Sequence, residues 1–340
     1  MRRIAIIGTG LIGASIGLGL KAAAIKDLDV VGYDKARGVA ATARKRGALD
    51  REARSAAAAV EGAGLVIVAT PVRAMRDVFQ EIAPHLAPGA VVTDVGSTKS
   101  AVMAWAAELL PETVHFVGGH PMAGKEQSGP EAAEADLFRG KAYCVVPSPS
   151  AAEAAVQNVV GLAETLGAAY RFMEAQEHDQ YVAAVSHVPF IASAALFSMA
   201  RGSAAWYDLA PLAGPGFRDV TRLASGDPVM ERDICLTNRE AIIHWLDRLV
   251  AELAHYRELI QQGDPEELLA ALGKVQELRD RFMAGLDMTL EEGKSPVELP
   301  SASDQIKAAL FGGYMVDAQR RLRELTEQAE QGDNGKRAKR

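Results

Sequence analysis

The chain has little cysteine: Cys144 and Cys235 lie far apart, and neither belongs to a CxxC pair. A disulfide framework and a thiolate metal site are therefore not expected, and we predict a cytoplasmic protein with reduced thiols and no bound metal. No stretch approaches the roughly 18 uninterrupted apolar residues of a membrane span. Basic residues do not dominate, since the formal net charge is -7, which argues against a nucleic-acid partner.

The chain is long enough, at 340 residues, for two domains. Short runs rich in Val and Ile alternate with Ala-rich helical stretches over its first half. The runs are residues 3–8, 29–34, 65–70, 90–96 and 115–119, followed by 141–147 and 168–174 at the far edge. This alternation predicts an α/β fold with βαβ units, a Rossmann-type dinucleotide-binding domain over residues 1–173.

From about residue 175 apolar residues recur at helical spacing, and strand-like runs are absent. We predict an all-α domain over residues 174–290, whose long amphipathic helices could pack against a second copy of the chain. Residues 291–340 read as a Pro- and Ser-containing linker, a terminal helix and a polar tail.

The stretch "GTGLIGASIG" places Gly8, Gly10 and Gly13 in a GxGxxG pattern directly after a strand and at the start of a helix. The first glycine permits a tight turn, the second lets the backbone approach a pyrophosphate, and the third allows close helix–strand packing. We expect this loop, with Leu11 and Ile12, to bind a dinucleotide at the helix N-terminus. A tight turn with no ligand is the alternative.

Asp34 ends the second strand, at the distance where a carboxylate accepts hydrogen bonds from a ribose 2′-hydroxyl and repels a 2′-phosphate. This position favours NAD over NADP. Lys35 and Arg37 beside it favour the opposite choice, because cations could accept a 2′-phosphate.

Ligands of open α/β sheets bind at the carboxyl ends of the strands. Two further strand ends should line this crevice and contact the cofactor, through Ala69, Thr70, Pro71 and Asp94. Ser97 nearby is either a substrate hydrogen-bond donor or a helix cap. His120 stands at the end of the next strand, in "GGHPMAG". A neutral histidine there suits proton abstraction in a carbinol oxidation, although turn carbonyls could simply hold it in place.

Six blocks together resemble the prephenate dehydrogenase family, including its arogenate and dual-specificity members. They are "GTGLIGASIG", "ATPV", "DVGSTK", "GGHPMAGKEQSG", "AVSHVPF" and "FRDVTRLASGDPVMERDI", in family order between residues 4 and about 285. The resemblance implies NAD-linked oxidative decarboxylation of prephenate to 4-hydroxyphenylpyruvate in tyrosine biosynthesis. It also implies a homodimer formed through the helical domains.

The resemblance extends to single residues. It implies that His120 takes the proton from the substrate's ring hydroxyl, and that Ser97 hydrogen-bonds this hydroxyl and helps to orient the histidine. Arg222 would bind a substrate carboxylate, a task that suits a planar, permanently charged group, although a surface ion pair is its alternative. The remaining implied contacts are Asp219, which would orient Arg222, Glu126 at the mouth of the site, and His187 from the helical domain, where its alternative role is to cap or bend a helix.

Other functions stay open at this point. Arogenate carries an amino group where prephenate has a ketone, and Glu231 or Glu126 could offer it a carboxylate. A β-hydroxyacid dehydrogenase would need a catalytic lysine in the helical domain, for which we find no motif. An NAD-sensing module without turnover is the third alternative. Glu231 also replaces an aromatic residue of some family members, and residues 286–340 have no evident counterpart of the family's amino-acid-sensing regulatory domain.

Overall fold

The computed structural model describes residues 2–125 and 127–286. Two compact units divide between Ile242 and Ile243, and each is described by itself. Glu126 and the predicted linker, terminal helix and tail over residues 291–340 lie outside the described residues.

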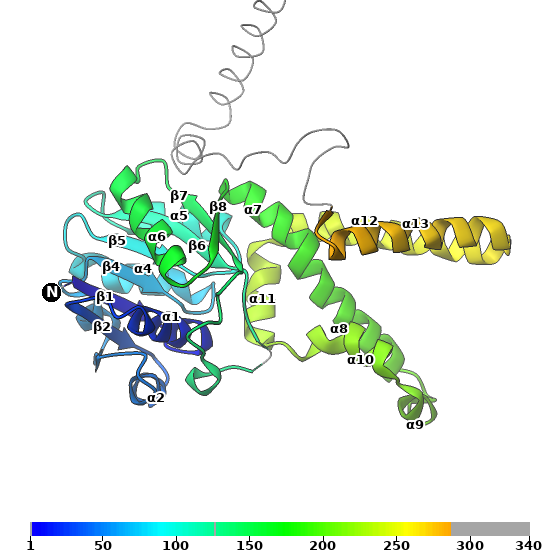
Figure 1. The fold of residues 1–340 in the computed structure, drawn as a ribbon, viewed down its shortest axis with the longest axis horizontal. Helices are drawn as coiled ribbons and strands as arrows, with labels where there is room; N and C mark the ends of the chain where they lie inside the picture. The colour runs from blue at the N-terminus through cyan, green and yellow to red at the C-terminus, as the bar shows by residue number, and fades with distance from the viewer. Residues whose placement is uncertain (1, 126, 287–340) are drawn as a thin grey trace, which may run out of the picture. The chain divides into compact units, whose positions relative to one another are not determined.

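The first unit is built on a single eight-stranded sheet in the order β3-β2-β1-β4-β5-β6-β7-β8 (Figure 1). Every predicted strand is present, and the α/β prediction is confirmed. The strands are β1 Arg2–Ile7, β2 Leu28–Tyr33, β3 Arg51–Glu52, β4 Leu65–Val68, β5 Val91–Asp94, β6 His115–Pro121, β7 Ala142–Pro147 and β8 Ala169–Phe172. The short β3 was not predicted, because Arg51 and Glu52 are exposed and carry no apolar pattern.

The last two strands run against the others. The pairs from β3 to β6 are all parallel, but β7 pairs antiparallel with β6 and β8 pairs parallel with β7, which differs from the parallel arrangement expected for the whole sheet. A parallel return needs a crossover of a dozen or more residues, usually a helix. The connection from Pro121 to Ala142 holds, in its described part, only the 3-10 turn Pro130–Ala132. His120 lies in β6, one residue before its end at Pro121, and pairs with Cys144.

Helices cover both faces of the sheet because successive side chains of a strand point to opposite sides. Ile6 belongs to one buried cluster and Ile7 to the other. The first cluster includes α1 Leu11–Ala22, α2 Val39–Lys45 and α6 Glu153–Thr165, and the second α3 Ala56–Val60, α4 Ala74–Ile82 and α5 Ser100–Leu109. This burial on both faces is what makes the strands read as continuous apolar runs.

The prediction of helices after residue 174 is confirmed for the described residues. They are α7 Ala175–Val182, α8 Val188–Arg201, α9 Trp206–Leu209, α10 Pro215–Thr221, α11 Pro228–Thr237 and the first residues of α12 Arg239–Gln262. A π-helical turn, Ala183–His187, joins α7 to α8. Pro189, which has no N–H to complete an α-helical bond, lies two residues after it. Asp227 caps α11 by accepting from Val229 N and Met230 N.

Among the described residues, the helical stretch Ala175–Arg201 has the length and apolar composition that could cross a membrane. One such helix is weak evidence, since core helices of soluble proteins pass the same test. Here Asp179 is buried and accepts hydrogen bonds from Lys99 N and Ser100 N. A carboxylate engaged in this way fits a helix packed within the protein.

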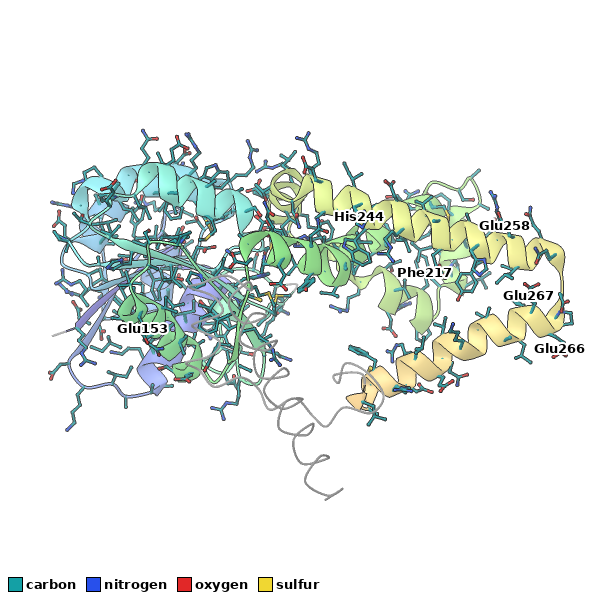
Figure 2. All side chains as sticks on the ribbon, turned by 90° about the horizontal axis from the view of Figure 1, so that it is seen from above. Glu153, Phe217, His244, Glu258, Glu266 and Glu267 are labelled. Atoms are coloured by element: carbon teal, nitrogen blue, oxygen red, sulfur yellow. The ribbon has the colours of Figure 1, made fainter. Side chains whose placement is uncertain are left out.

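The described part of the second unit contains most of α12 and α13 Pro265–Met283, joined by a turn at Gly263 and Asp264. Figure 2 shows α12, which carries His244 and Glu258, followed by α13, whose first turn carries Glu266 and Glu267. Both helices expose large apolar side chains. These are Ile243, Val250, Leu253 and Ile260 on α12, and Leu269, Leu272, Val275, Leu278, Phe282 and Met283 on α13.

Candidate active site

The three glycines of the β1–α1 loop differ in what surrounds the position of a side chain. Gly8 has a φ of 90°, and a Cβ on it would lie 2.4 Å from the carbonyl oxygen of Ala69. A Cβ on Gly13 would lie 1.9 Å from the carbonyl oxygen of Gly8. Packing therefore requires both glycines. A Cβ on Gly10 would meet nothing within 4 Å, so this position borders open space at the N-terminus of α1, beside the half-buried Leu11 and Ile12.

Asp34 stands at the end of β2, held against the same loop. Its carboxylate accepts from Thr9 N at 2.8 Å and from Ala36 N at 2.9 Å. Because β1 pairs with both β2 and β4, the connections on either side of it leave in opposite directions, which opens a crevice at the strand ends. Thr70 lies at the end of β4, between Ala69 and Pro71, and its Oγ1 is buried without a partner among the described residues. An open glycine position, a fixed carboxylate and an unpaired hydroxyl fit a dinucleotide.

Beneath the site lies a buried ion pair between Lys99 and Asp94, both with fully buried side chains. Asp94 also accepts from Gly96 N at 2.7 Å and from Gly119 N at 3.1 Å. Its two oxygens thus join the end of β5 to the residue before His120. Both carboxylate oxygens of Asp94 therefore already have partners within the protein.

Three side chains form a hydrogen-bonded chain that ends at His120. Nδ1 of His120 lies 2.9 Å from Nε2 of His178, and Nδ1 of His178 lies 2.9 Å from Oδ1 of Asp179. His178 is fully buried, and His120 is 7% exposed. Nε2 of His120 makes no hydrogen bond within the part of the chain that the structure describes. The chain links the end of β6 to the first turns of α7.

His187 approaches from the π-helical turn and is 1% exposed. Nδ2 of Asn238 donates to the carbonyl oxygen of Asp179 at 2.7 Å and lies 3.2 Å from Nδ1 of His187. Since the amide nitrogen is a donor, Nδ1 of His187 accepts, and its proton is on Nε2. This Nε2 is buried and makes no hydrogen bond of acceptable geometry among the described residues, although an interaction with the backbone of Ser97 opposes the lowering of the ring's pKa by burial. The N–H is therefore available to a ligand.

Burial sets the charge of these histidines. It holds the pKa of His120 well below its ordinary value, and the electrostatic influence of His178, Lys99 and His187 lowers it further by smaller amounts. Burial also lowers the pKa of His178, although the bond to Asp179 opposes the shift, and lowers the pKa of His187 to about 4. The pKa of Asp179 is lowered: burial alone would raise it, but its bonds to His178 and Ser100 outweigh that effect. Near neutral pH the histidines are therefore neutral, and His120 can act as a base.

The other predicted site residues are less buried than the histidines, where the structure describes them. Ser97 is half-buried in the β5–α5 loop. Arg222 is exposed and opens the 3-10 turn Arg222–Ser225, and its backbone N–H donates to the carbonyl oxygen of Asp219. The carboxylate of Asp219 is exposed on α10 and makes no ion pair among the described residues. Glu126 is outside the described residues, and the roles of all four stay predictions.

Sequence reasoning missed His178, Asp179 and Asn238. In the structure the bond that orients His120 comes from His178, whereas Ser97 was expected to contribute to that orientation. The signal was the adjacent pair His178-Asp179 near the start of the helical stretch Ala175–Arg201, most of which is apolar. A carboxylate that accepts from one ring nitrogen of a histidine holds the imidazole in a single tautomer.

Comparison with known proteins gives a consistent result. Residues 16–171 match the family model "Prephenate dehydrogenase, nucleotide-binding domain", and residues 174–274 match "Prephenate dehydrogenase, dimerization domain". The chain is 36% identical over 279 residues to a prephenate dehydrogenase of Bacillus subtilis, which covers 82% of this chain and 75% of the relative. It is 33% identical over 280 residues to a cyclohexadienyl dehydrogenase of Zymomonas mobilis, covering 82% and 95%.

Solved structures agree. A prephenate dehydrogenase of Aquifex aeolicus in complex with hydroxyphenyl propionate and NAD⁺ has a TM-score of 0.77 at 30% identity and covers 83% of this chain and 98% of that one. An arogenate dehydrogenase of Synechocystis has a TM-score of 0.70 at 28% identity and covers 82% and 99%. The fold, the glycine loop and the histidine cluster are thus found on a chain that belongs to the prephenate dehydrogenase family.

Proposed function

We propose that the chain catalyses the NAD-dependent oxidative decarboxylation of prephenate to 4-hydroxyphenylpyruvate, a step of tyrosine biosynthesis, in the cytoplasm. The observation that supports this most directly is His120, buried in β6 beside the strand ends, with Nδ1 engaged and Nε2 left without a partner among the described residues. Family membership supplies the substrate class.

The β1–α1 loop, the ends of β2 and β4 and the N-terminus of α1 would hold NAD. Gly10 leaves room for the pyrophosphate, Asp34 accepts from the adenosine ribose, and Thr70 Oγ1 offers an unpaired hydroxyl. The remaining contacts of this group would come from Gly8, Leu11, Ile12, Gly13, Ala69, Pro71 and the backbone of Asp94. When bound, NAD accepts the hydride that leaves the substrate's carbinol carbon.

The substrate's ring hydroxyl would face His120. As the carbinol is oxidised, Nε2 of His120 takes the hydroxyl proton and the oxygen becomes a carbonyl. Loss of the ring carboxylate as CO₂ then leaves the electron pair in the new aromatic ring, and the resulting phenolate oxygen recovers the proton from His120. The base is regenerated within one turnover, and formation of the aromatic ring drives the step.

Other residues would bind and orient the substrate. Ser97 hydrogen-bonds the ring hydroxyl, and Nε2 of His187 donates to a substrate oxygen, which would satisfy its buried N–H. Arg222 binds a carboxylate, with Asp219 near it along the chain and Glu126 at the mouth of the site. A neutral His187 suits this role because a donor that carries no charge does not compete with Arg222 for the carboxylate.

The experiment that tests this function is NADH formation by the purified chain with prephenate and L-arogenate in parallel, each with NAD and NADP. We expect turnover with prephenate and NAD, accompanied by release of CO₂ and appearance of 4-hydroxyphenylpyruvate. Cofactor binding with no consumption of either substrate would instead support a sensing module.

The same assay decides the second candidate, arogenate, which is favoured by the similarity to a cyclohexadienyl dehydrogenase and an arogenate dehydrogenase. Glu231 is half-buried, and burial, with a smaller contribution from Asp227, raises the pKa of its carboxyl group. A carboxylate with a raised pKa gains from a cation, and the ammonium group of arogenate is one. Equal turnover of both substrates would identify a dual-specificity enzyme.

Asp34→Asn should shift the cofactor preference. The variant keeps an oxygen for Thr9 N and loses the charge that repels a 2′-phosphate, while Lys35 and Arg37 remain. We expect the ratio of kcat/KM for NAD over NADP to fall about tenfold, the value of one hydrogen bond to a charged group. Asp27→Asn, at the start of the same strand and exposed, is the control. An unchanged ratio would remove Asp34 from the ribose site.

We further propose a homodimer formed through the helical domain. The exposed apolar side chains of α12 and α13 support it, because Val250 is 63% and Leu253 60% exposed, and contiguous surfaces of this kind mark interfaces. Val250→Asp combined with Leu253→Asp should raise the dissociation constant of the dimer at least about tenfold, as central interface residues do. Sedimentation equilibrium measures it, with Glu258→Ala as the control. A wild-type chain that sediments as a monomer contradicts the proposal.

A further inference from the structure

The chain of His120, His178 and Asp179 has a direction that its donors and acceptors determine. Asp179 is a carboxylate whose pKa is lowered by its hydrogen bonds, so it can only accept. It accepts from Lys99 N at 2.7 Å and Ser100 N at 2.8 Å, and its Oδ1 lies 2.9 Å from Nδ1 of His178. Nδ1 of His178 must therefore carry a proton.

The next link follows from the first. His178 is neutral near neutral pH, since burial lowers its pKa, and a neutral imidazole with a proton on Nδ1 has a lone pair on Nε2. Nε2 of His178 lies 2.9 Å from Nδ1 of His120 and so accepts from it. We propose that His178 and Asp179 are positioning residues that fix the proton of His120 on Nδ1, so that its Nε2 carries the lone pair that takes the substrate proton.

This inference rests on the proposed function, in which His120 is the base. It explains why Nε2 of His120, and not Nδ1, has the lone pair that takes the substrate proton. Without an acceptor at Nδ1, the neutral ring of His120 could place its proton on either nitrogen, and the molecules with a proton on Nε2 could not act as bases. A triad aspartate performs the same task for the histidine of serine proteases.

The arrangement also distributes the charge that forms during the reaction. When Nε2 of His120 takes a proton, its Nδ1–H becomes a stronger donor, and His178 with the negative charge of Asp179 behind it is there to accept. Several groups face the two histidines from other elements. They are Asp179 on α7, Asp94 at the end of β5, Lys99 directly before α5, His187 in the π-helical turn and Cys144 opposite His120 on β7. Lys99 is paired with Asp94, burial raises the pKa of the Cys144 thiol to about 11, and His187 is neutral, so Asp179 supplies the negative charge.

Two substitutions of His178 separate the acceptor from the packing. His178→Phe keeps a flat ring of similar size and removes both nitrogens. His178→Gln keeps an amide oxygen that can accept from Nδ1 of His120. We expect the kcat of His178→Phe to fall about 10- to 100-fold, with the KM for NAD changed less than about threefold. His178→Gln should recover most of that loss.

The pH profile gives a readout that loss of packing would not move. In His178→Phe the protonated form of His120 loses its acceptor, so His120 becomes a weaker base, and the acid limb of kcat/KM should move to lower pH. A kcat and an acid limb equal to those of the wild type would overturn the proposal. So would equal losses in the Phe and Gln variants, because the acceptor would then not be what matters.

A spectroscopic test on the wild-type chain does not depend on whether a variant folds. In ¹⁵N spectra of histidine side chains near pH 7.5, the resonance that His120→Asn removes should show a protonated Nδ1 and an unprotonated Nε2. A proton on Nε2 would overturn the proposal. The proposed function fails separately, if His120→Asn itself retains normal turnover.

Discussion

His120→Asn should lower kcat for prephenate oxidation by about 10² to 10⁴, the contribution of a positioned general base. Asparagine is close to histidine in the position of its first polar atom, so its side chain can still meet Nε2 of His178. It has no nitrogen lone pair at the position of Nε2. The loss should therefore appear in kcat, while the dissociation constant of NAD stays within about threefold, because the glycine loop and Asp34 are untouched.

His115→Asn is the matched control for this experiment. His115 lies at the other end of β6, and its Nδ1 makes one long contact, 3.5 Å, with Ala152 N. The same substitution on the same strand, away from the histidine cluster, should leave kcat unchanged. A variant of His120 that turns over at the wild-type rate would show that the proton leaves by another route.

The sequence predicted those parts of the molecule whose determinants are local. The glycine loop was predictable because the three requirements of Gly8, Gly10 and Gly13 fall within six consecutive residues. The strands were predictable because a sheet covered on both faces makes them continuous apolar runs. The direction of β7 was not predictable, because an apolar run does not show which way its strand runs. Only the lack of a crossover helix among the described residues between Pro121 and Ala142 indicates it.

The histidine chain was not predictable for a different reason. His120 and His178 are 58 residues apart, and nothing in either segment states that α7 lies against β6. Asn238 is 59 residues from Asp179 and belongs to the junction of α11 and α12. The contacts depend on how the helical segment packs on the sheet. The family resemblance identified His120, and only the three-dimensional arrangement identifies the side chains that determine which of its nitrogens is free.

Lys99→Met should destabilise the chain by about 3–5 kcal/mol, the cost of leaving one partner of a buried ion pair without the other. Both side chains of the pair are fully buried. Asp94 would keep its bonds to Gly96 N and Gly119 N, which compensate its charge only in part. The free energy of unfolding in urea at fixed protein concentration measures the effect. Lys141→Met, at an exposed lysine, is the control and should change it by less than about 0.5 kcal/mol.

The double variant Asp94→Asn with Lys99→Met shows whether the loss comes from the uncompensated charge. Because the pair disappears as a whole, we expect the double variant to be more stable than Lys99→Met alone, as when buried pairs are replaced elsewhere. A Lys99→Met chain as stable as the wild type would mean that water reaches Asp94. The double variant could regain stability and still turn over more slowly. That result would show that the ion pair positions His120, because Asp94 accepts from Gly119 N, the residue before His120 in β6.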